Sequence, residues 1–318
     1  MEFNTCASAG CHNYHNNRSL YTDFLIKHLD EPDLLDKPVL PRREFAYLLD
    51  EVASYPHNQY PVKPLTITES DKPEAIVSTD KINNDWLISS HSRIGANCTS
   101  CHLQNNNKPQ DSKWINRPDH TACVSCHEME VQHFKRGKHG MRLGSGLSAM
   151  TPEMAMLPMK TDSMNNELDC NSCHPAHKYD ITTAAVDACL TCHNDKHSLS
   201  YKQSKHFVLW QLEQSGAAEE GTGVSCASCH MPRISYDVSE WLSRIMVQHN
   251  QNANLVPNEK MIRSVCMQCH GLEFSIDSLA DAQLIEHNFK GKPAIHIPSM
   301  DMAKKDHQRH LEKSSTDE

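Results

Sequence analysis

Fourteen cysteines fall into seven clusters, and a histidine directly follows the second cysteine of every cluster. Six clusters read Cys-x-x-Cys-His, whereas the first, at residues 6–12, has four residues between its cysteines. None is left over for a disulfide, a free thiol or a further thiolate ligand. Any fold must therefore present two thiols and one imidazole together at seven places. The cysteines are Cys6, Cys11, Cys98, Cys101, Cys123, Cys126, Cys170, Cys173, Cys189, Cys192, Cys226, Cys229, Cys266 and Cys269.

The order Cys-x-x-Cys-His is the attachment signature of c-type haem. Each thiol adds to one vinyl group of the porphyrin, and the adjacent imidazole binds the iron as its proximal ligand. In the first cluster, Gly10 tolerates the unusual backbone angles that would absorb two additional residues. The pattern predicts seven covalently attached haem c groups. The predicted proximal ligands are His12, His102, His127, His174, His193, His230 and His270.

Zinc and disulfide bonds are the alternative explanations of the cysteine pattern. Cys170, Cys173, Cys189 and Cys192 alone have the spacing of a zinc ribbon. Zinc, however, does not require a histidine after every second cysteine. With 22 histidines in 318 residues, seven such coincidences have odds on the order of one in a hundred million. Six haems with an aberrant first cluster remain the alternative to seven.

The composition is poor in the side chains that normally fill a protein core. Hydrophobic residues make up 38% of the chain and aromatic residues only 6%, which is low for a globular protein of this length. We expect the haems to supply much of the apolar core, and folding to depend on their attachment. The expected fold class is mostly α and irregular, with little or no β-sheet and a core formed by stacked haems.

The charge and hydropathy patterns restrict partners and location. A formal net charge of −9 argues against nucleic acid and favours partners with basic patches. The sequence has no apolar run of the length that a transmembrane helix needs. It also has no charged-then-apolar signal segment. Because thioether attachment normally happens outside the bacterial cytoplasm, we expect a periplasmic or extracellular, cell-surface protein whose signal peptide has been removed.

The clusters are unevenly distributed along the chain. We expect an N-terminal segment, 1–85, with one isolated haem, a six-haem domain, 86–300, and a charged, frayed tail, 301–318. Apolar residues at helical spacing predict the helices. The predicted helices cover residues 18–29, 41–52, 200–214, 236–250 and 275–289, and residues 54–85 are predicted to be loop with a short hairpin.

Fifteen of the 22 histidines do not follow a cysteine, which is more than enough for a second imidazole on every iron. Bis-histidine ligation gives a low-potential haem that suits electron transfer and blocks substrate binding. A histidine just beyond a proximal one is placed to reach a neighbouring haem rather than its own. The candidate distal ligands are His91, His120, His139, His177, His197, His206 and His249, with His15, His28, His133 and His287 as replacements and His307 and His310 as tail residues.

Three segments carry a resemblance to a known family: CHPAHKYD, CHNDKHSLSYKQSKH and GVSCASCHMPR. They resemble the multihaem cytochrome c superfamily that includes octahaem hydroxylamine oxidoreductase, octahaem tetrathionate reductase and pentahaem nitrite reductase. The resemblance spans about residues 86–275 and implies distal roles for His177, His197 and His206. The chain departs from these enzymes in having seven clusters and no Cys-x-x-Cys-Lys site. None of its eight tyrosines matches the one that cross-links the catalytic haem of hydroxylamine oxidoreductase.

The histidine supply and the lack of a catalytic haem signature together predict an electron carrier with no assigned catalytic residue. Its haems would act in anaerobic respiration, and the protein would be a soluble carrier or a subunit of a conduit or filament. Expected partners are other cytochromes, quinol-linked donors or further copies of the chain. The alternative is a reductase of a small nitrogen or sulfur oxyanion, of the hydroxylamine, nitrite or tetrathionate type, with one open iron. Its substrate-binding candidates are Arg136, Lys138, His139 and Arg142.

Overall fold

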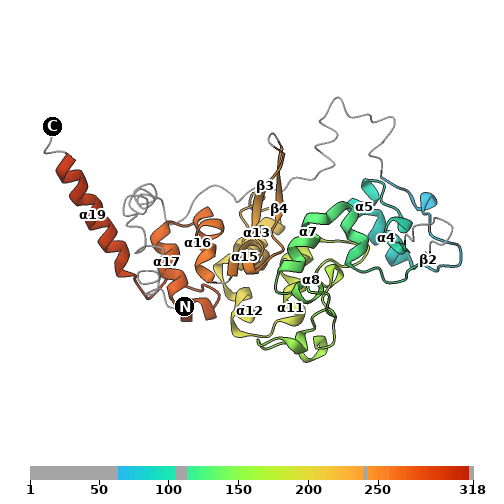
Figure 1. The fold of residues 1–318 in the computed structure, drawn as a ribbon, viewed down its shortest axis with the longest axis horizontal. Coiled ribbons are helices and arrows are strands. Elements are labelled where there is room, and N and C mark those ends of the chain that lie inside the picture. The colour runs from blue at the N-terminus through green and yellow to red at the C-terminus, as the bar shows by residue number, and fades with distance from the viewer. Residues whose placement is uncertain (1–63, 105–112, 240–241, 256, 315–318) are drawn as a thin grey trace. The chain divides into compact units, whose positions relative to one another are not determined.

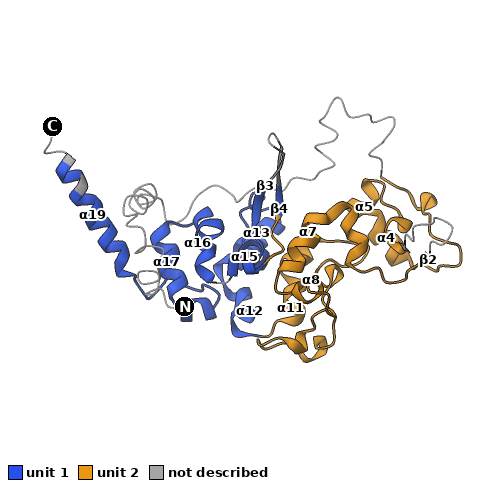
Figure 2. Ribbon diagram, viewed as in Figure 1, with its two compact units in different colours: residues 1–41, 195–246, 251–318 blue, residues 42–194, 247–250 orange. Residues whose placement is uncertain are grey.

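The computed structural model describes residues 64–104, 113–239, 242–255 and 257–314. Its described residues form two compact units (Figure 2). Unit 1 takes them from 195–246 and 251–314, and unit 2 from 64–194 and 247–250. Four described cysteine motifs therefore belong to unit 2 and two to unit 1. The expected segments 1–85, 86–300 and 301–318 stay a prediction, and the helices predicted over 18–29 and 41–52 lie outside the described residues.

Unit 2 consists of short helices joined by irregular chain (Figure 1). Its longest helix is α7, Val124–Arg136, and its strands β1 and β2 pair antiparallel, with Leu103 opposite Trp114. The elements are η1 Ile67–Glu69, α4 Asp80–Leu87, α5 Ser90–Arg93, α6 Cys98–His102, β1 Leu103–Gln104, β2 Lys113–Trp114, η3 His120–Cys123, α7, α8 Met141–Gly144, η4 Pro152–Met154, η5 Thr161–Ser163, α9 Cys170–Cys173, α10 Ile181–Ala185 and α11 Asp187–Cys192.

Unit 1 is also helical and contains the second two-stranded sheet, β3 with β4 (Figure 1). Residues 247–250, which follow this sheet, belong to unit 2. The elements are α12 Lys196–Ser200, η6 Tyr201–Gln203, α13 Lys205–Gln214, α14 Cys226–His230, β3 Arg233–Ser239, β4 Leu242–Val247, α15 Asn252–Leu255, η7 Asn258–Lys260, α16 Met261–Ser264, η8 Cys266–Gln268, α17 Leu272–Ala280, α18 Ala282–Glu286 and α19 Pro298–Ser314.

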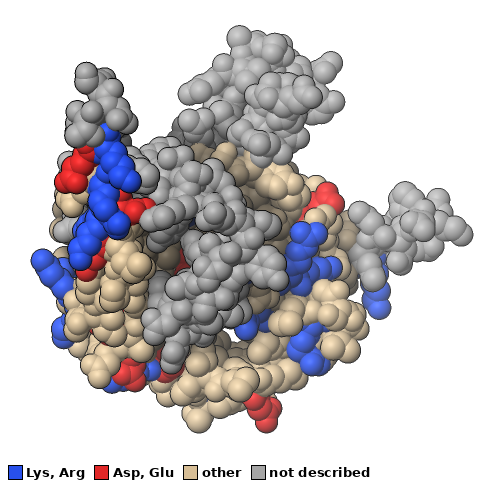
Figure 3. Space-filling model, turned by 60° about the vertical axis from the view of Figure 1, so that its left-hand side comes forward, with Lys and Arg blue, Asp and Glu red and all other residues tan. Residues whose placement is uncertain are grey.

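The predicted fold class is confirmed, because helices dominate and the sheets have two strands each. The helices predicted over 200–214 and 275–289 are present in two pieces each. The first is divided at Ser204, which caps α13, and the second at Asp281, whose side chain caps α18. Among the described residues, no helix is both long and apolar enough to span a bilayer. Figure 3 shows acidic and basic side chains on the same face of the molecule.

Three predictions about secondary structure are wrong. In place of the predicted helix over 236–250, residues 236–239 belong to β3 and 242–247 to β4, and the alternation of Ile234, Tyr236 and Val238 is the strand signal that was overlooked. The tail is not frayed from residue 301, because α19 continues to Ser314; it begins at Pro298, and proline is favourable at the first helical position. Helix α4 begins inside the predicted loop, where the side chain of Thr79 accepts a hydrogen bond from the Ile82 amide.

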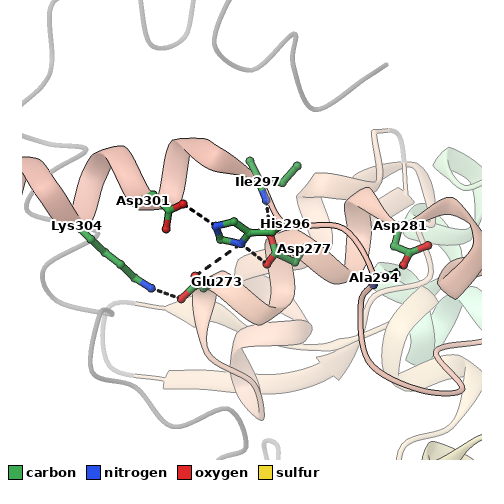
Figure 4. A network of polar contacts seen from close by, with 8 residues as sticks. All are labelled: Glu273, Asp277, Asp281, Ala294, His296, Ile297, Asp301 and Lys304. Atoms are coloured by element: carbon green, nitrogen blue, oxygen red, sulfur yellow. Dashed lines mark hydrogen bonds and ion pairs between the residues drawn. The ribbon is translucent and has the colours of Figure 1, made fainter.

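A polar network connects α19 to α17 through His296 (Figure 4). The Nδ1 atom of His296 lies 2.9 Å from Asp277 Oδ2 and its Nε2 atom 3.1 Å from Asp301 Oδ2. Glu273 lies 3.8 Å from Nδ1 and forms an ion pair with Lys304 of α19. Hydrogen bonds to Asp277 and Asp301 raise the pKa of His296. Beside this network, Leu272 packs with Met300 in a small apolar cluster.

We expect the connection between α17 and α19 to weaken as pH rises. A histidine whose folded pKa is raised contributes stability below its unfolded pKa of about 6.5, and this contribution is lost as pH passes the folded value. His296→Gln should therefore lower the melting temperature more at pH 5.5 than at pH 8.5. The measurement is thermal unfolding of both proteins at each pH.

The matched control for this experiment is His287→Gln, because the exposed ring of His287 contacts the Gln283 carbonyl oxygen within its own helical turn. It should show a smaller effect of substitution than His296→Gln at pH 5.5. An equal effect of His296→Gln at both pH values would contradict the prediction.

Candidate metal centres

Each of the six described Cys-x-x-Cys-His motifs lies on a helix or helical turn, as the attachment geometry requires. The second motif forms α6, the fourth α9, and the sixth α14. The third spans η3 and the start of α7, the fifth ends α11, and the seventh forms η8. The first motif, with Cys6, Cys11 and His12, lies outside the described residues.

Reciprocal caps explain why three motifs form isolated helices of only four or five residues. A polar residue precedes the first cysteine and serves as N-cap, and the serine before the second cysteine accepts a hydrogen bond from the N-cap amide. The side chain of the N-cap residue in turn accepts a hydrogen bond from the amide of this serine. Both bonds use backbone donors that a helix start leaves without partners. The pairs are Asn97 with Ser100, Asp169 with Ser172, and Ser225 with Ser228.

The proximal histidines lie opposite other histidines in six pairs. The two ring centroids in each pair are 5.9–6.4 Å apart. Four pairs belong to unit 2 and two to unit 1. The pairs are His102–His177, His127–His91, His174–His249, His193–His139, His230–His197 and His270–His206.

This separation fits two imidazoles that bind one iron from opposite sides. A metal–nitrogen bond is about 2.0 Å long, so two such rings have centroids about 6 Å apart. The planes are nearly parallel for His102 and His177, at 6°, and nearly perpendicular for His127 and His91, at 88°. Two thiols stand beside each proximal ring in the motif order. The residues present therefore fit a covalently attached haem with two axial histidines at each of the six sites.

Six of the seven candidate distal histidines take part in these pairs, and His120 does not. His120 lies beside Asp169, with its Nδ1 atom 3.9 Å from Oδ1 and its amide bonded to Oδ2 at 3.0 Å. Of the replacement candidates, His133 is buried in α7 and His287 is exposed. His15 and His28 lie outside the described residues. The ligand roles of all these residues stay predictions.

Three of the paired rings occupy surroundings that strongly favour the neutral imidazole. Burial, with a smaller effect of the partner ring, lowers the pKa of His139 and His206 to about 4. Burial likewise lowers the pKa of His174 to about 4, with His249 the next cause. A neutral imidazole is the form that binds a metal ion.

Backbone carbonyls orient three of the paired rings. The Nδ1 atom lies 2.6 Å from the Ile115 oxygen in His102, 2.5 Å from the Ile285 oxygen in His197, and 3.0 Å from the Val247 oxygen in His249. A carbonyl oxygen only accepts, so Nδ1 carries the proton in each ring. The lone pair is then on Nε2, which is the arrangement commonly found for histidines that bind metals.

Cysteines of consecutive motifs lie close to one another. Burial raises the pKa of Cys173 to about 12, and Cys189 and Cys192 add to the effect. Burial also raises the pKa of Cys229 to about 12, with Cys266 and Cys269 contributing. The twelve described cysteines form no disulfide.

Two further thiol contacts join the motifs of unit 2. Cys101 is near Cys123 and Cys126, and Cys123 is hydrogen-bonded to Cys170. Attachment points are therefore adjacent in chain order from the second motif to the fifth, and from the sixth to the seventh.

The basic residues proposed for oxyanion binding have other contacts. Arg142 donates from Nε to the Ser148 carbonyl at 3.1 Å and from Nη2 to its hydroxyl at 3.0 Å. His139 is half-buried opposite His193. Arg136 and Lys138 are exposed, and a role of these four residues in anion binding stays a prediction.

Aromatic contacts with the paired histidines were missed in the sequence. Trp114 stacks on His102 at 4.6 Å, and Phe274 stacks on His270 at 4.8 Å. Tyr179 meets His91 edge-on at 4.5 Å. The contact of Phe274 with His270, four residues earlier, was the local signal, whereas the contact between Tyr179 and His91 depends on tertiary structure.

The fold and these sites have the features of multihaem c-type cytochromes, a class in which electron transfer is the common activity. Residues 90–194 match the family model of cytochrome c3, and this segment contains all four motifs of unit 2. The chain is thus similar to cytochrome c3 over that segment. No curated protein and no solved structure matches the chain.

Removing the reciprocal cap should destabilise the fourth motif. Ser172→Ala deletes the hydroxyl that accepts from the Asp169 amide at 3.0 Å and donates to the Glu167 carbonyl at 3.0 Å. We expect a loss of about 1 kcal/mol in the free energy of unfolding, measured by chemical denaturation. Ser125→Ala is the control, since the exposed Ser125 precedes Cys126 but does not cap a helix. Equal losses for the two variants would exclude a role of the cap.

Proposed function

We propose that this protein is a heptahaem c-type cytochrome that carries electrons along a chain of bis-histidine haems. The six histidine pairs are the observation that carries this proposal, since each combines a motif histidine with a second imidazole at 5.9–6.4 Å. Bound haem would supply the redox-active iron. Cysteines of each motif would hold it covalently, and the paired histidines would hold its iron.

Paired imidazoles suit electron transfer for a physical reason. An iron held on both sides by protein nitrogen has no coordination position left for a substrate. Rings fixed by buried packing and by the carbonyls of Ile115, Ile285 and Val247 keep the same positions in both oxidation states. The rearrangement that would slow electron exchange is thereby kept small.

Neighbouring attachment points support a definite order of haems. In unit 2, contacts between Cys101 and Cys123, Cys123 and Cys170, and Cys173 and Cys189 favour a path through the second, third, fourth and fifth haems. In unit 1, the proximity of Cys229 to Cys266 favours a sixth-to-seventh step. Electrons would pass within each unit in the order in which the motifs occur along the chain.

The remaining parts of the proposal depend on the sequence. Cys6, Cys11 and His12 would hold a seventh haem, and the segments CHPAHKYD and GVSCASCHMPR favour a relative of the hydroxylamine oxidoreductase group. Thioether chemistry favours a periplasmic or extracellular location. The net charge of −9 favours basic redox partners, such as other cytochromes. A reductase would need one open iron, and none of the six described pairs supports it.

The first test is the number and spin state of the haems. We expect mass spectrometry of the mature protein to give seven added haems, and the oxidised protein to have a low-spin spectrum that cyanide and nitrite leave unchanged. Zinc instead of haem, or far fewer haems, would refute the proposal. A high-spin signal that shifts with nitrite would favour the reductase.

The second test removes one distal ligand. His139→Ala should convert one haem to a high-spin form that binds cyanide, because His139 faces the proximal His193 at 6.3 Å. The control is His120→Ala, whose ring lies beside Asp169 and should leave all haems low-spin. The electron paramagnetic resonance spectrum distinguishes the two. A high-spin haem in His120→Ala but not in His139→Ala would reverse the assignment.

A further inference from the structure

The turn after α18 contacts both distal histidines of unit 1. It comprises residues 285–290, and its neighbours are His197 of α12 and His206 of α13. Two polar contacts connect the turn to neighbouring elements of unit 1. Lys196 forms an ion pair with Glu286 at 2.8 Å, and Lys290 donates to Gln203 at 3.4 Å.

Asn288 is aimed at His197. Its Nδ2 atom donates to the His197 carbonyl oxygen at 3.1 Å and lies 3.3 Å from His197 Nε2. The Ile285 carbonyl accepts a hydrogen bond from Nδ1 of the same ring, so the lone pair on Nε2 is the one that would bind iron. With Nε2 bound to iron, the contact that Asn288 keeps is its hydrogen bond to the His197 carbonyl oxygen, and Asn288, which is 8% exposed, thus fixes the backbone from which the ring extends.

Phe289 contacts both rings. Its ring centroid lies 6.4 Å from that of His197, at 87°, and 6.2 Å from that of His206, at 59°. Such tilted contacts are within the range in which aromatic rings attract each other. Phe289 is thereby the side chain shared by the sixth and seventh histidine pairs.

The backbone of the turn is strained at these two residues. Asn288 has a φ of 51° and Phe289 a φ of 55°. A left-handed conformation is uncommon and unfavourable for a bulky residue such as phenylalanine. Strain of this kind persists where the surrounding structure requires a side chain in one position. Here that position is the contact with the two histidines.

We propose that Asn288 and Phe289 are positioning residues for the distal ligands of the sixth and seventh haems. Asn288 fixes the backbone of His197, and Phe289 packs against the rings of His197 and His206 together. This inference rests on the proposed bis-histidine ligation and extends it. The two residues act through the histidines and leave the haem attachment itself unchanged.

The test compares three variants of the full-length holoprotein by electron paramagnetic resonance and potentiometric titration. Asn288→Gly removes the side chain while suiting the left-handed backbone, and should shift the low-spin signal and midpoint potential of the sixth haem alone. Phe289→Leu should shift both the sixth and the seventh. Lys290→Ala is the matched control. Lys290 belongs to the same turn but donates to Gln203 of η6 rather than to a histidine, so this variant should shift the signals of neither haem.

The signals are assigned with His197→Met and His206→Met, each of which changes the ligand of one haem. Phe289→Tyr keeps the ring and should restore the wild-type signals that Phe289→Leu shifts. Full haem content with unchanged signals in both Asn288→Gly and Phe289→Leu would overturn the proposal, and so would equal shifts in Lys290→Ala. Absence of low-spin haem from the wild-type protein itself would instead refute the proposed function.

Discussion

The opposition of two imidazoles is the constraint on which the described structure depends. Each of the six pairs has a ring separation near 6 Å, and each combines a residue fixed by its cysteine motif with one from a distant segment. Under the proposed function, a shared iron is what brings the two rings of each pair face to face. Short helices and irregular chain are then enough for the fold, because the histidines specify where segments meet.

Much of the site was predictable because local chemistry sets the motif. A cysteine pair followed by histidine specifies its own helical turn, and the capping serines Ser100, Ser172 and Ser228 stabilise that turn within five residues. Six of the seven candidate distal histidines were also found opposite proximal ones. The expectation that a histidine just beyond a motif reaches a neighbouring site agrees with His177, which lies opposite His102 and not His174.

The pairing itself could not be predicted, because it depends on tertiary structure. His249 lies opposite His174 only because residues 247–250 belong to unit 2 after the chain has formed β3 and β4 in unit 1. The error at 236–250 arose there, since helical spacing was given more weight than the alternation of Ile234, Tyr236 and Val238. His120 was a candidate because it lies three residues before Cys123, and its contact with Asp169 was invisible in the sequence.

Adjacent attachment of consecutive motifs has a consequence for robustness. Cys123 reaches Cys170, and Cys173 approaches Cys189, so that each redox centre of unit 2 would have its neighbours in sequence as its neighbours in space. In such a chain, electrons would pass through each haem in turn. Its throughput would be limited by its slowest single hop, and damage at an interior centre would interrupt the current while damage at an end would only shorten the reach.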